Sequence, residues 1–434
     1  MFFVAMEIIK PSLFVSVRRP AFFGLVAVSL CSFASYSAAA ELVLQKVPAL
    51  TVEQAPSYPE NLARYPLGAQ IEVTPKGDAS AEAALLAGDP TAGYDLPNGT
   101  TSVLVSLGKV ENIDSVSFLQ QNTKGRVTIA TSNAKLPADS PQWNTIAEQD
   151  LTSDSVKVKI GPSEAKYLRL TFNVTEPGRI ADLGVYSTPT VSAFTMPRAR
   201  KTASDSLAMV SYKVSDLHAK ARAVYVSSGE DVKQANNMID DQPGTVYNFA
   251  PPDAAPTAVV DLGKATKLRR ISALYSPGRG KLDFYVLQSL PGGPQAASAK
   301  SLQLDEASMA GMQQVGSVND EGSGRAAVDF PETTGRYILL KWTPAEPSAP
   351  FSVAEIAAFG GEKRENLVAA NTPAEGPGHD TMAGDGKTVL DGKDFKDMAD
   401  AKDIPEEGPA EGPGSALPPP PPFVFTPVVA PASP

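Results

Sequence analysis

Short runs of alternating apolar and polar residues recur along this chain. Residues 126–130 (RVTIA), 156–160 (VKVKI) and 281–286 (KLDFYV) follow this pattern, which is typical of strands with one face buried and one in water. Gly, Pro, Asn and Asp separate the runs, as turn residues do. Many short strands of this kind favour an antiparallel sandwich over a βαβ fold, so we expect an all-β protein.

The same succession of segments occurs twice. Matching pairs are 61–63 with 216–218, 89–91 with 241–243, 107–109 with 262–264, and 166–170 with 336–340. Ordered repetition at similar spacing indicates a duplicated domain. We therefore predict one domain at residues 41–188, a linker at 189–201 and a second domain at 202–361.

These ordered segments resemble the discoidin, or coagulation-factor type C, domain of the galactose-binding-like superfamily. The resemblance covers both units and implies two tandem antiparallel jelly-roll β-sandwiches. The chain departs from the family at the aromatic residue after the Asp-Pro-Thr type of loop, which is usually tryptophan and is Tyr94 or Tyr247 here. The ligands of animal relatives therefore cannot be assigned to this chain from the resemblance.

The first forty residues have the order of a secretory signal peptide. Basic residues up to Arg19 precede an apolar run at 21–33, and small residues at 37–40 precede Glu41. The apolar run is shorter than the roughly 20 residues of a membrane-spanning helix. We expect cleavage of residues 1–40, no permanent membrane span afterwards, and a secreted, periplasmic or cell-envelope location. The only cysteine, Cys31, would be lost with the peptide.

Residues 362–434 change in character. They are acidic first and then rich in proline, with five consecutive prolines at 418–422 and few large apolar side chains. Such a segment cannot offset the entropy of ordering, so we expect a disordered tail. The proline run is either a docking element for a protein partner or a spacer.

Charge and histidine content restrict the function. The formal net charge is −10, which disfavours nucleic acid as a partner. Only His218 and His379 are available as histidine bases, and no Gly-x-Ser-x-Gly turn accompanies them. We expect no enzymatic activity.

The family resemblance implies a structural calcium ion in each domain. It would be held by the Asp loop and by an acidic residue on the last strand, because calcium prefers oxygen ligands. The corresponding residues are Asp89, Thr91 and Asp182 in the first unit and Asp241, Thr245 and Glu355 in the second. In the alternative interpretation these residues only form turns and solvated strand ends.

The resemblance implies that ligands bind to loops at one end of the sandwich, where aromatic faces can stack on sugars. The candidates are Tyr58, Tyr65, Tyr94, Tyr247, Phe249 and Tyr275. The alternative for each is packing in the core. We expect a non-catalytic exported protein that binds carbohydrate or another cell-surface component. The alternative is a structural or adhesion protein of the envelope that contacts partners through its proline-rich tail.

Overall fold

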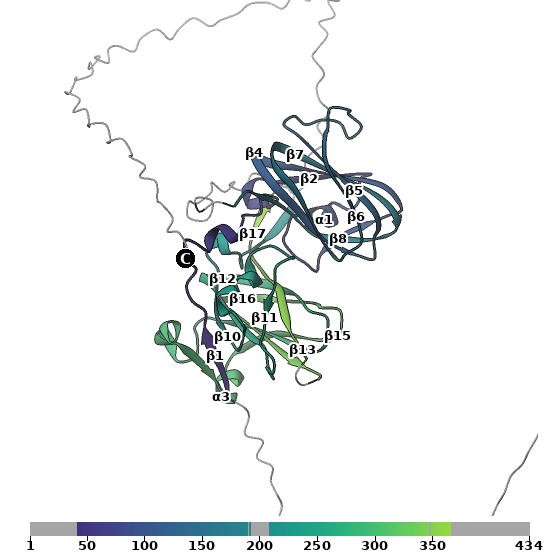
Figure 1. Cartoon of the computed structure of the whole chain (residues 1–434). Coiled ribbons are helices and arrows are strands. Elements are labelled where there is room, and N and C mark those ends of the chain that lie inside the picture. Colours follow the sequence, from purple (N-terminus) through teal and green to yellow (C-terminus); the bar gives the residue numbers. More distant parts are fainter. Residues whose placement is uncertain (1–40, 190, 192–207, 347–348, 366–434) are drawn as a thin grey trace, which may run out of the picture. The chain divides into compact units, whose positions relative to one another are not determined.

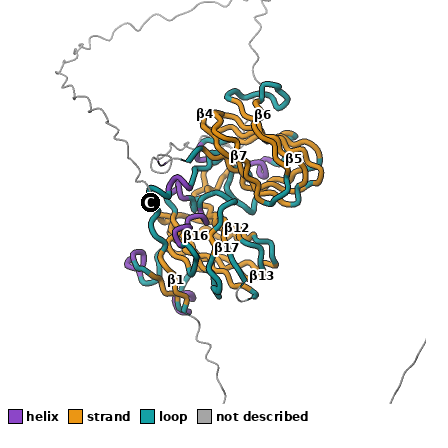
Figure 2. The backbone as a smooth tube through the Cα atoms, in the orientation of Figure 1, coloured by secondary structure: helices purple, strands orange, loops and turns teal. Residues whose placement is uncertain are grey.

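The computed structural model describes residues 41–189, 191, 208–346 and 349–365 (Figure 1). The predicted signal peptide, most of the predicted linker and nearly all of the predicted tail lie outside these residues. Figure 2 shows that strands form most of the described chain and that its helices are short. Among the described residues, no helix has the length and apolar character needed to cross a membrane.

The first sandwich is built from seven antiparallel strands and one short helix. The strands are β2 (Gln70–Thr74), β3 (Gly93–Leu96), β4 (Gly99–Gln121), β5 (Lys124–Ser132), β6 (Asn144–Asp150), β7 (Ser155–Glu176) and β8 (Gly178–Ser187), and the helix is α1 (Ala79–Ala84). Their order is β3-β8-β4-β7-β5-β6, with β2 also paired to β4. Asp78 caps α1 by accepting hydrogen bonds from the backbone N–H groups of Ser80 and Ala81.

Long strands join the two layers of this sandwich. The start of β4 pairs with β2, and its end pairs with β8. Between these parts, its pairing with β7 shifts register between Ser106 and Glu111. Such an irregularity bends a strand and increases its twist. One strand therefore contributes to both faces, as in a jelly roll.

The second sandwich repeats this arrangement. Its strands are β9 (Ala208–Lys213), β10 (Arg222–Val226), β11 (Tyr247–Asn248), β12 (Thr257–Tyr275), β13 (Arg279–Leu287), β15 (Gln313–Glu321), β16 (Arg325–Pro344) and β17 (Ser352–Glu365). Six strand pairs of the first sandwich recur in the second. In the first they are β2–β4, β3–β8, β4–β7, β4–β8, β5–β6 and β5–β7. In the same order, their counterparts in the second are β10–β12, β11–β17, β12–β16, β12–β17, β13–β15 and β13–β16. The prediction of two tandem antiparallel β-sandwiches is confirmed.

Each sandwich has its own apolar core. In the first, Phe118 and Phe172 meet edge to face with ring centroids 5.5 Å apart. In the second, Trp342 stacks on Phe351 at 5.0 Å. The predicted alternation holds in β5, where Val127 and Ile129 are fully buried while their sequence neighbours Arg126 and Thr128 are more exposed.

The N-terminal segment does not belong to the first sandwich. Strand β1 (Leu42–Lys46) lies between β10 and β14 (Ser301–Leu304) of the second sandwich. Val47 and Tyr58, which follow it, belong to the second core. The predicted boundary at residue 41 therefore differs from the structure. The alternating pattern specifies a strand, but not which sheet edge that strand joins.

Strand β1 also completes a small apolar cluster on the outside of the second sandwich. Leu44 packs there with Tyr225, Leu302 and Leu304. Strand β14 belongs to an insertion between β13 and β15 that includes the short helix α3 (Glu306–Ala310). The first half has no such insertion, because only a short turn and loop separate β5 from β6.

This placement predicts that Leu44→Ala destabilises the second sandwich. Leu44 is fully buried, and such truncations cost about 2–5 kcal/mol. Val43→Ala is the matched control: Val43 lies on the same strand and is 48% exposed, so it should change stability by less than about 0.5 kcal/mol. Denaturant unfolding followed by tryptophan fluorescence measures both. Equal stability of the two variants would contradict the position of β1.

Candidate functional site

Equivalent turns open the two sandwiches. In the first, Asn61 Oδ1 accepts hydrogen bonds from the backbone N–H groups of Ala63 and Val185, both at 3.0 Å. This fixes the opening turn to β8. In the second, Asp216 Oδ1 accepts from the backbone N–H of His218 at 2.7 Å and caps the 3-10 helix Leu217–Ala219. The pairing of residues 61–63 with 216–218 in sequence therefore reflects a shared structure.

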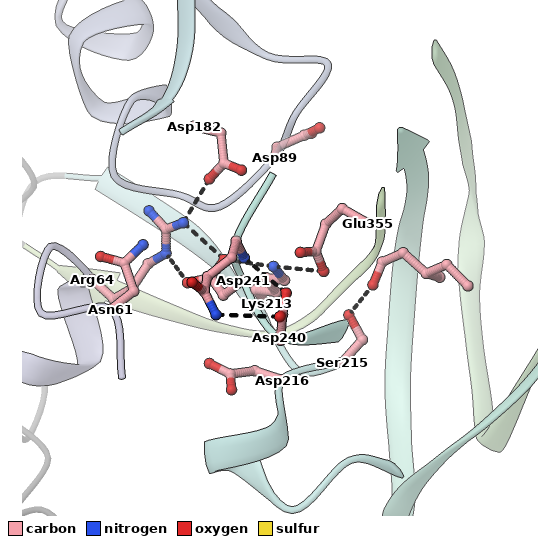
Figure 3. Close-up of polar contacts among 12 residues, drawn as sticks. Asn61, Arg64, Asp89, Asp182, Lys213, Ser215, Asp216, Asp240, Asp241 and Glu355 are labelled. Atoms are coloured by element: carbon pink, nitrogen blue, oxygen red, sulfur yellow. Dashed lines mark hydrogen bonds and ion pairs between the residues drawn. The ribbon is translucent and has the colours of Figure 1, made fainter. Parts of the chain in front are cut away.

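Arg64, directly after the first opening turn, contacts both sandwiches. Its Nη2 donates to Asp182 Oδ1 at 2.6 Å within the first sandwich. Its Nε and Nη2 donate to the two carboxylate oxygens of Asp241 in the second, each at 2.8 Å. Figure 3 shows the guanidinium between these acids. A bidentate pair of this kind fixes orientation as well as charge.

Lys213, the last residue of β9, binds two acids of the second sandwich. Its Nζ lies 2.6 Å from Asp241 Oδ1 and 3.0 Å from Glu355 Oε1 (Figure 3). The Lys213, Asp241 and Glu355 side chains are 5%, 2% and 0% exposed. We call Arg64, Asp182, Lys213, Asp241 and Glu355 the charge cluster.

A second set of bonds joins the sandwiches beside this cluster. Arg270 on β12 donates from Nε to Asp89 Oδ2 at 2.7 Å and from Nη2 to Thr91 Oγ1 at 2.9 Å. Ser272 Oγ donates to Asp89 Oδ1 at 2.9 Å. The buried Tyr186 hydroxyl donates to the backbone carbonyl of Asp241 at 2.6 Å. The contact between the sandwiches is thus polar, with several direct hydrogen bonds across it.

Two members of the charge cluster have a left-handed backbone. Asp182 has φ 47° and Asp241 has φ 60°, a left-handed conformation that few residues other than glycine adopt. Gly88 has φ 77°, and a β-carbon there would lie 3.0 Å from Lys213 Cδ and 3.1 Å from Arg64 Nε. Strain of this kind persists only where the surroundings enforce it, and it is typical of functional sites.

The loop at residues 88–91 and the loop at residues 241–243 match each other in a different register from the one that the sequence predicts. Gly88 and Asp241 both have positive φ, and each precedes a proline by two residues. Asp89 is therefore the structural counterpart of Gln242, and Gly88 is the counterpart of Asp241. The sequence alignment was one position out of step because it matched the aspartates.

Burial and charge act against each other in the cluster. Burial alone would raise the pKa of Asp241, but Arg64 and Lys213 outweigh it and hold that pKa below its usual range. Burial would lower the pKa of Lys213, but Asp241 and Glu355 raise it. Both groups are therefore ionised at neutral pH.

The remaining acids are too many for the available cations. Burial raises the pKa of Asp182 against the effect of Arg64, and it raises the pKa of Glu355 against the effect of Lys213. Burial also raises the pKa of Asp240 to about 8, although Thr245 and the backbone of Gln242 hydrogen-bond to it. Burial thus opposes ionisation of all three carboxyl groups.

A hollow opens beside the cluster, between the two opening turns. We call it the inter-sandwich hollow. It measures about 530 Å³ including its mouth, and it is lined by Glu60, Asn61, Arg64, Tyr65, Pro66, Leu67, Leu86, Ala87, Tyr212, Lys213, Asp216 and Ala219. Asn61 is 3% exposed, and its Nδ2 has no hydrogen-bond partner among the described residues. This hollow is the candidate ligand site.

The residues expected to bind calcium do not fit that ion. Asp89 is paired with Arg270, Asp182 with Arg64, and Asp241 and Glu355 with Lys213. Thr91 and Thr245 donate to neighbouring carboxylates, namely Asp89 and Asp240. Calcium needs six to eight oxygen ligands at about 2.3–2.6 Å. Within the described part of the chain, no group of three acidic, histidine or cysteine side chains is arranged to hold a metal.

The aromatic residues named as candidates for ligand binding are buried, as the alternative of core packing has it. Their exposed fractions are 6% for Tyr58, 4% for Tyr65, 6% for Tyr94, 1% for Tyr247, 4% for Phe249 and 4% for Tyr275. Tyr275 donates to Asp320 at 2.7 Å and Tyr247 to the Ser228 carbonyl at 2.7 Å. Among these residues, only Tyr65 lines the hollow. Apolar rings near loops pack inward when the core has room for them.

Sequence reasoning missed Arg64, Lys213 and Arg270. Arg64 follows the recognised Asn61-Leu62-Ala63 motif, and Lys213 ends an alternating run. Basic residues at such positions usually extend into solvent. Only the packing of one sandwich against the other reveals their role.

Asp216 is predicted to control the protonation of His218. Burial would lower the pKa of His218, but the bond to Asp216, whose Oδ1 lies 3.3 Å from His218 Nδ1, raises it. Asp216→Asn keeps an acceptor for the His218 N–H, and it should bring this pKa below the usual value of about 6.5. Because a raised histidine pKa stabilises the fold below pH ~6.5 and the effect is lost as pH rises through the raised value, the variant should lose more stability at pH 5 than at pH 8.

Proton NMR titration of the two histidines measures this, with His379→Gln to assign the signals. Asp231→Asn is the control, because Asp231 also caps a 3-10 helix, by accepting from Lys233 N, and it does not act on His218. An unchanged His218 pKa in Asp216→Asn would contradict the assigned role.

Comparisons with known proteins find similarity in structure only. No family model matches the chain, and no curated protein does. Among solved structures, the module CpGH89CBM32-6 of Clostridium perfringens is 21% identical, with a TM-score of 0.26, over 30% of this chain and 99% of its own. The fucolectin of Morone saxatilis (striped bass) is 12% identical, with a TM-score of 0.26, over 69% of this chain and 98% of its own.

Allantoicase of Saccharomyces cerevisiae is 13% identical, with a TM-score of 0.26, over 73% of this chain and all of its own. A fucosidase of Ruminococcus gnavus is matched over 27% of its length. These are proteins to which the chain is similar in structure.

Proposed function

We propose that this protein is a non-catalytic binding protein that recognises carbohydrate, and that the ligand sits in the inter-sandwich hollow. The observation that carries the proposal is the composition of the hollow. Planar polar side chains and apolar or aromatic ones line the same small space. Ligand sites generally combine an apolar lining with a few fixed polar groups.

The polar part of the lining suits hydroxyl groups. Asn61 Nδ2 is a buried donor without a partner among the described residues, while Asp216 supplies a carboxylate acceptor. A sugar hydroxyl both donates and accepts, so it would satisfy groups of either kind. An apolar ligand would leave the Asn61 donor without a partner, at a cost in affinity.

The apolar part suits the face of a sugar ring. Pro66, Leu67 and Leu86 line the hollow together with the rings of Tyr65 and Tyr212. Carbon-bound hydrogens of a pyranose ring pack on such surfaces while its hydroxyls point to the polar groups.

The hollow lacks the arrangement of a catalytic centre. Its lining includes no serine, threonine, cysteine or histidine that would act as a nucleophile or base. Burial would raise the pKa of Asp216, but the bond to His218 lowers it. A lowered pKa suits a hydrogen-bond acceptor and is the reverse of what a general acid needs.

The location follows from the N-terminal sequence. The pattern of residues 1–40 supports export, so we place the protein in the periplasm, the cell envelope or the medium. There, a carbohydrate ligand would be a cell-surface or extracellular glycan. The proline-rich end of the chain would serve as a spacer or as a contact for a protein partner.

The proposal predicts selective binding on a glycan array that is lost when the hollow is filled. Ala219→Phe and Ala87→Phe place a ring in the hollow from the second and first sandwich, respectively. Each should weaken binding at least tenfold, because the ring occupies the ligand's volume. Ala134→Phe is the matched control, since Ala134 is exposed in the turn after β5 and should bind as the unchanged protein does. Thermal unfolding checks that all variants remain folded.

A second arm of the experiment separates the alternative function. Removal of residues 366–434, which lie beyond the end of β17, should leave glycan binding intact. A blank array from folded protein, together with capture of a protein partner that disappears with the tail, would replace the carbohydrate proposal with a structural or adhesion role.

A further inference from the structure

Basic side chains of this chain contact acids that the family resemblance assigns to calcium. Asp182 on β8 and Glu355 on β17 are on equivalent strands, and both are 0% exposed. Arg64 Nη2 lies 2.6 Å from the first, and Lys213 Nζ lies 3.0 Å from the second. The same two cations converge on Asp241. Each sandwich therefore has a basic side chain at the acid on its last strand.

We propose that Lys213 and Arg64 are built-in replacements for structural calcium, so that both sandwiches fold without metal and are locked to each other by the acid that the two cations share. Lys213 supplies the cation of the second sandwich. Arg64 supplies that of the first and extends to Asp241 of the second. The proposal does not depend on the ligand of the hollow.

Space and charge exclude a metal ion while these side chains are present. A calcium ion bound to Asp241 and Glu355 would lie about 2.3–2.6 Å from their oxygens. Lys213 Nζ already contacts these groups at 2.6 Å and 3.0 Å, so the ion and the ammonium would overlap and repel each other. Little room remains on the Gly88 side, because even a β-carbon added there would lie 3.0 Å from Lys213 Cδ and 3.1 Å from Arg64 Nε.

Charge balance supports the same interpretation. In the charge cluster, two cations, Arg64 and Lys213, face three carboxylates, those of Asp182, Asp241 and Glu355. Each of these carboxylates already has a cation within 3.0 Å, so a divalent ion would have to displace a buried ion pair.

The first test compares thermal unfolding of the unchanged protein in EDTA and in millimolar calcium chloride. The melting temperatures should agree within ~1 °C, because ligand that does not bind the native state gives no stabilisation. Isothermal titration with calcium chloride should show no uptake. A calcium-dependent rise of several degrees, or stoichiometric uptake, would overturn the proposal.

The second test creates a gap at the cation position. Lys213→Ala leaves Glu355 buried without its partner, so the melting temperature should fall by roughly 5–10 °C. Adding n-propylammonium chloride, which has the atoms that the substitution removes, should restore part of the loss. The same concentrations of sodium chloride and 1-propanol should not. Unchanged stability of Lys213→Ala would overturn the proposal.

Lys281→Ala is the matched control. Lys281 Nζ also pairs with an aspartate, Asp283, at 2.9 Å, but its side chain is 49% exposed. Loss of an exposed pair has little effect on stability. This variant should melt within ~2 °C of the unchanged protein and should not respond to propylammonium.

A double variant covers the case in which Lys213→Ala does not fold. Lys213→Met leaves the Glu355 charge unbalanced, whereas Lys213→Met with Glu355→Gln removes both charges. The double variant should be more stable than Lys213→Met alone, since removing the second charge relieves the first loss. If the two losses simply add, charge compensation by Lys213 is wrong. The metal comparison on the unchanged protein decides independently of these variants.

Discussion

Burial of the Asp241 carboxylate is the constraint on which the arrangement of this protein depends. Its side chain is 2% exposed, and an ionised carboxylate can be removed from water only if cations and donors replace the water. Arg64 comes from the first sandwich and Lys213 from the second. The two sandwiches must therefore meet in one orientation for this acid to be compensated. Removing one member of such a buried pair costs about 3–5 kcal/mol, whereas apolar replacement of the whole pair is often neutral, so the cluster specifies orientation more than it adds net stability.

The inter-sandwich hollow is a consequence of the same contact. The opening turns that bring Arg64 and Lys213 to Asp241 also bring Asn61 and Asp216 to opposite parts of one lining. Asn61 Oδ1 is used by two backbone N–H groups, which leaves only its Nδ2 for a ligand. Bonds within their own sandwiches hold Asn61 and Asp216, and the shared Asp241 holds Arg64 and Lys213. Neither sandwich supplies it alone.

Periodicity and repetition were sufficient to predict the sandwiches. Alternation such as that of residues 126–130 determines which side chains enter a core, and Val127 and Ile129 do so. The candidate site was less accessible, since it depends on contacts between segments that are far apart in sequence. Arg64 and Asp241 are 177 positions apart, and nothing local marks Arg64 as buried. Tyr247 and Tyr275 were candidates for ligand binding because they lie near loops, yet the core has room for their rings. The Ser228 carbonyl and Asp320 accept hydrogen bonds from their hydroxyls.

The charge cluster also depends on a difference between the two copies of the domain at one position. Gly88 and Asp241 are counterparts with the same left-handed backbone, φ 77° and φ 60°. The stems of Arg64 and Lys213 pass Gly88 so closely that a β-carbon there would lie 3.0–3.1 Å from them, which is tight for any side chain. If both positions had carried an aspartate, the β-carbon at position 88 would have pressed on both cations that reach the shared acid. With glycine at both positions, they would have had no shared acid to reach. The left-handed turn was common to the two copies, and the difference of one side chain at this turn allowed one sandwich to dock on the other.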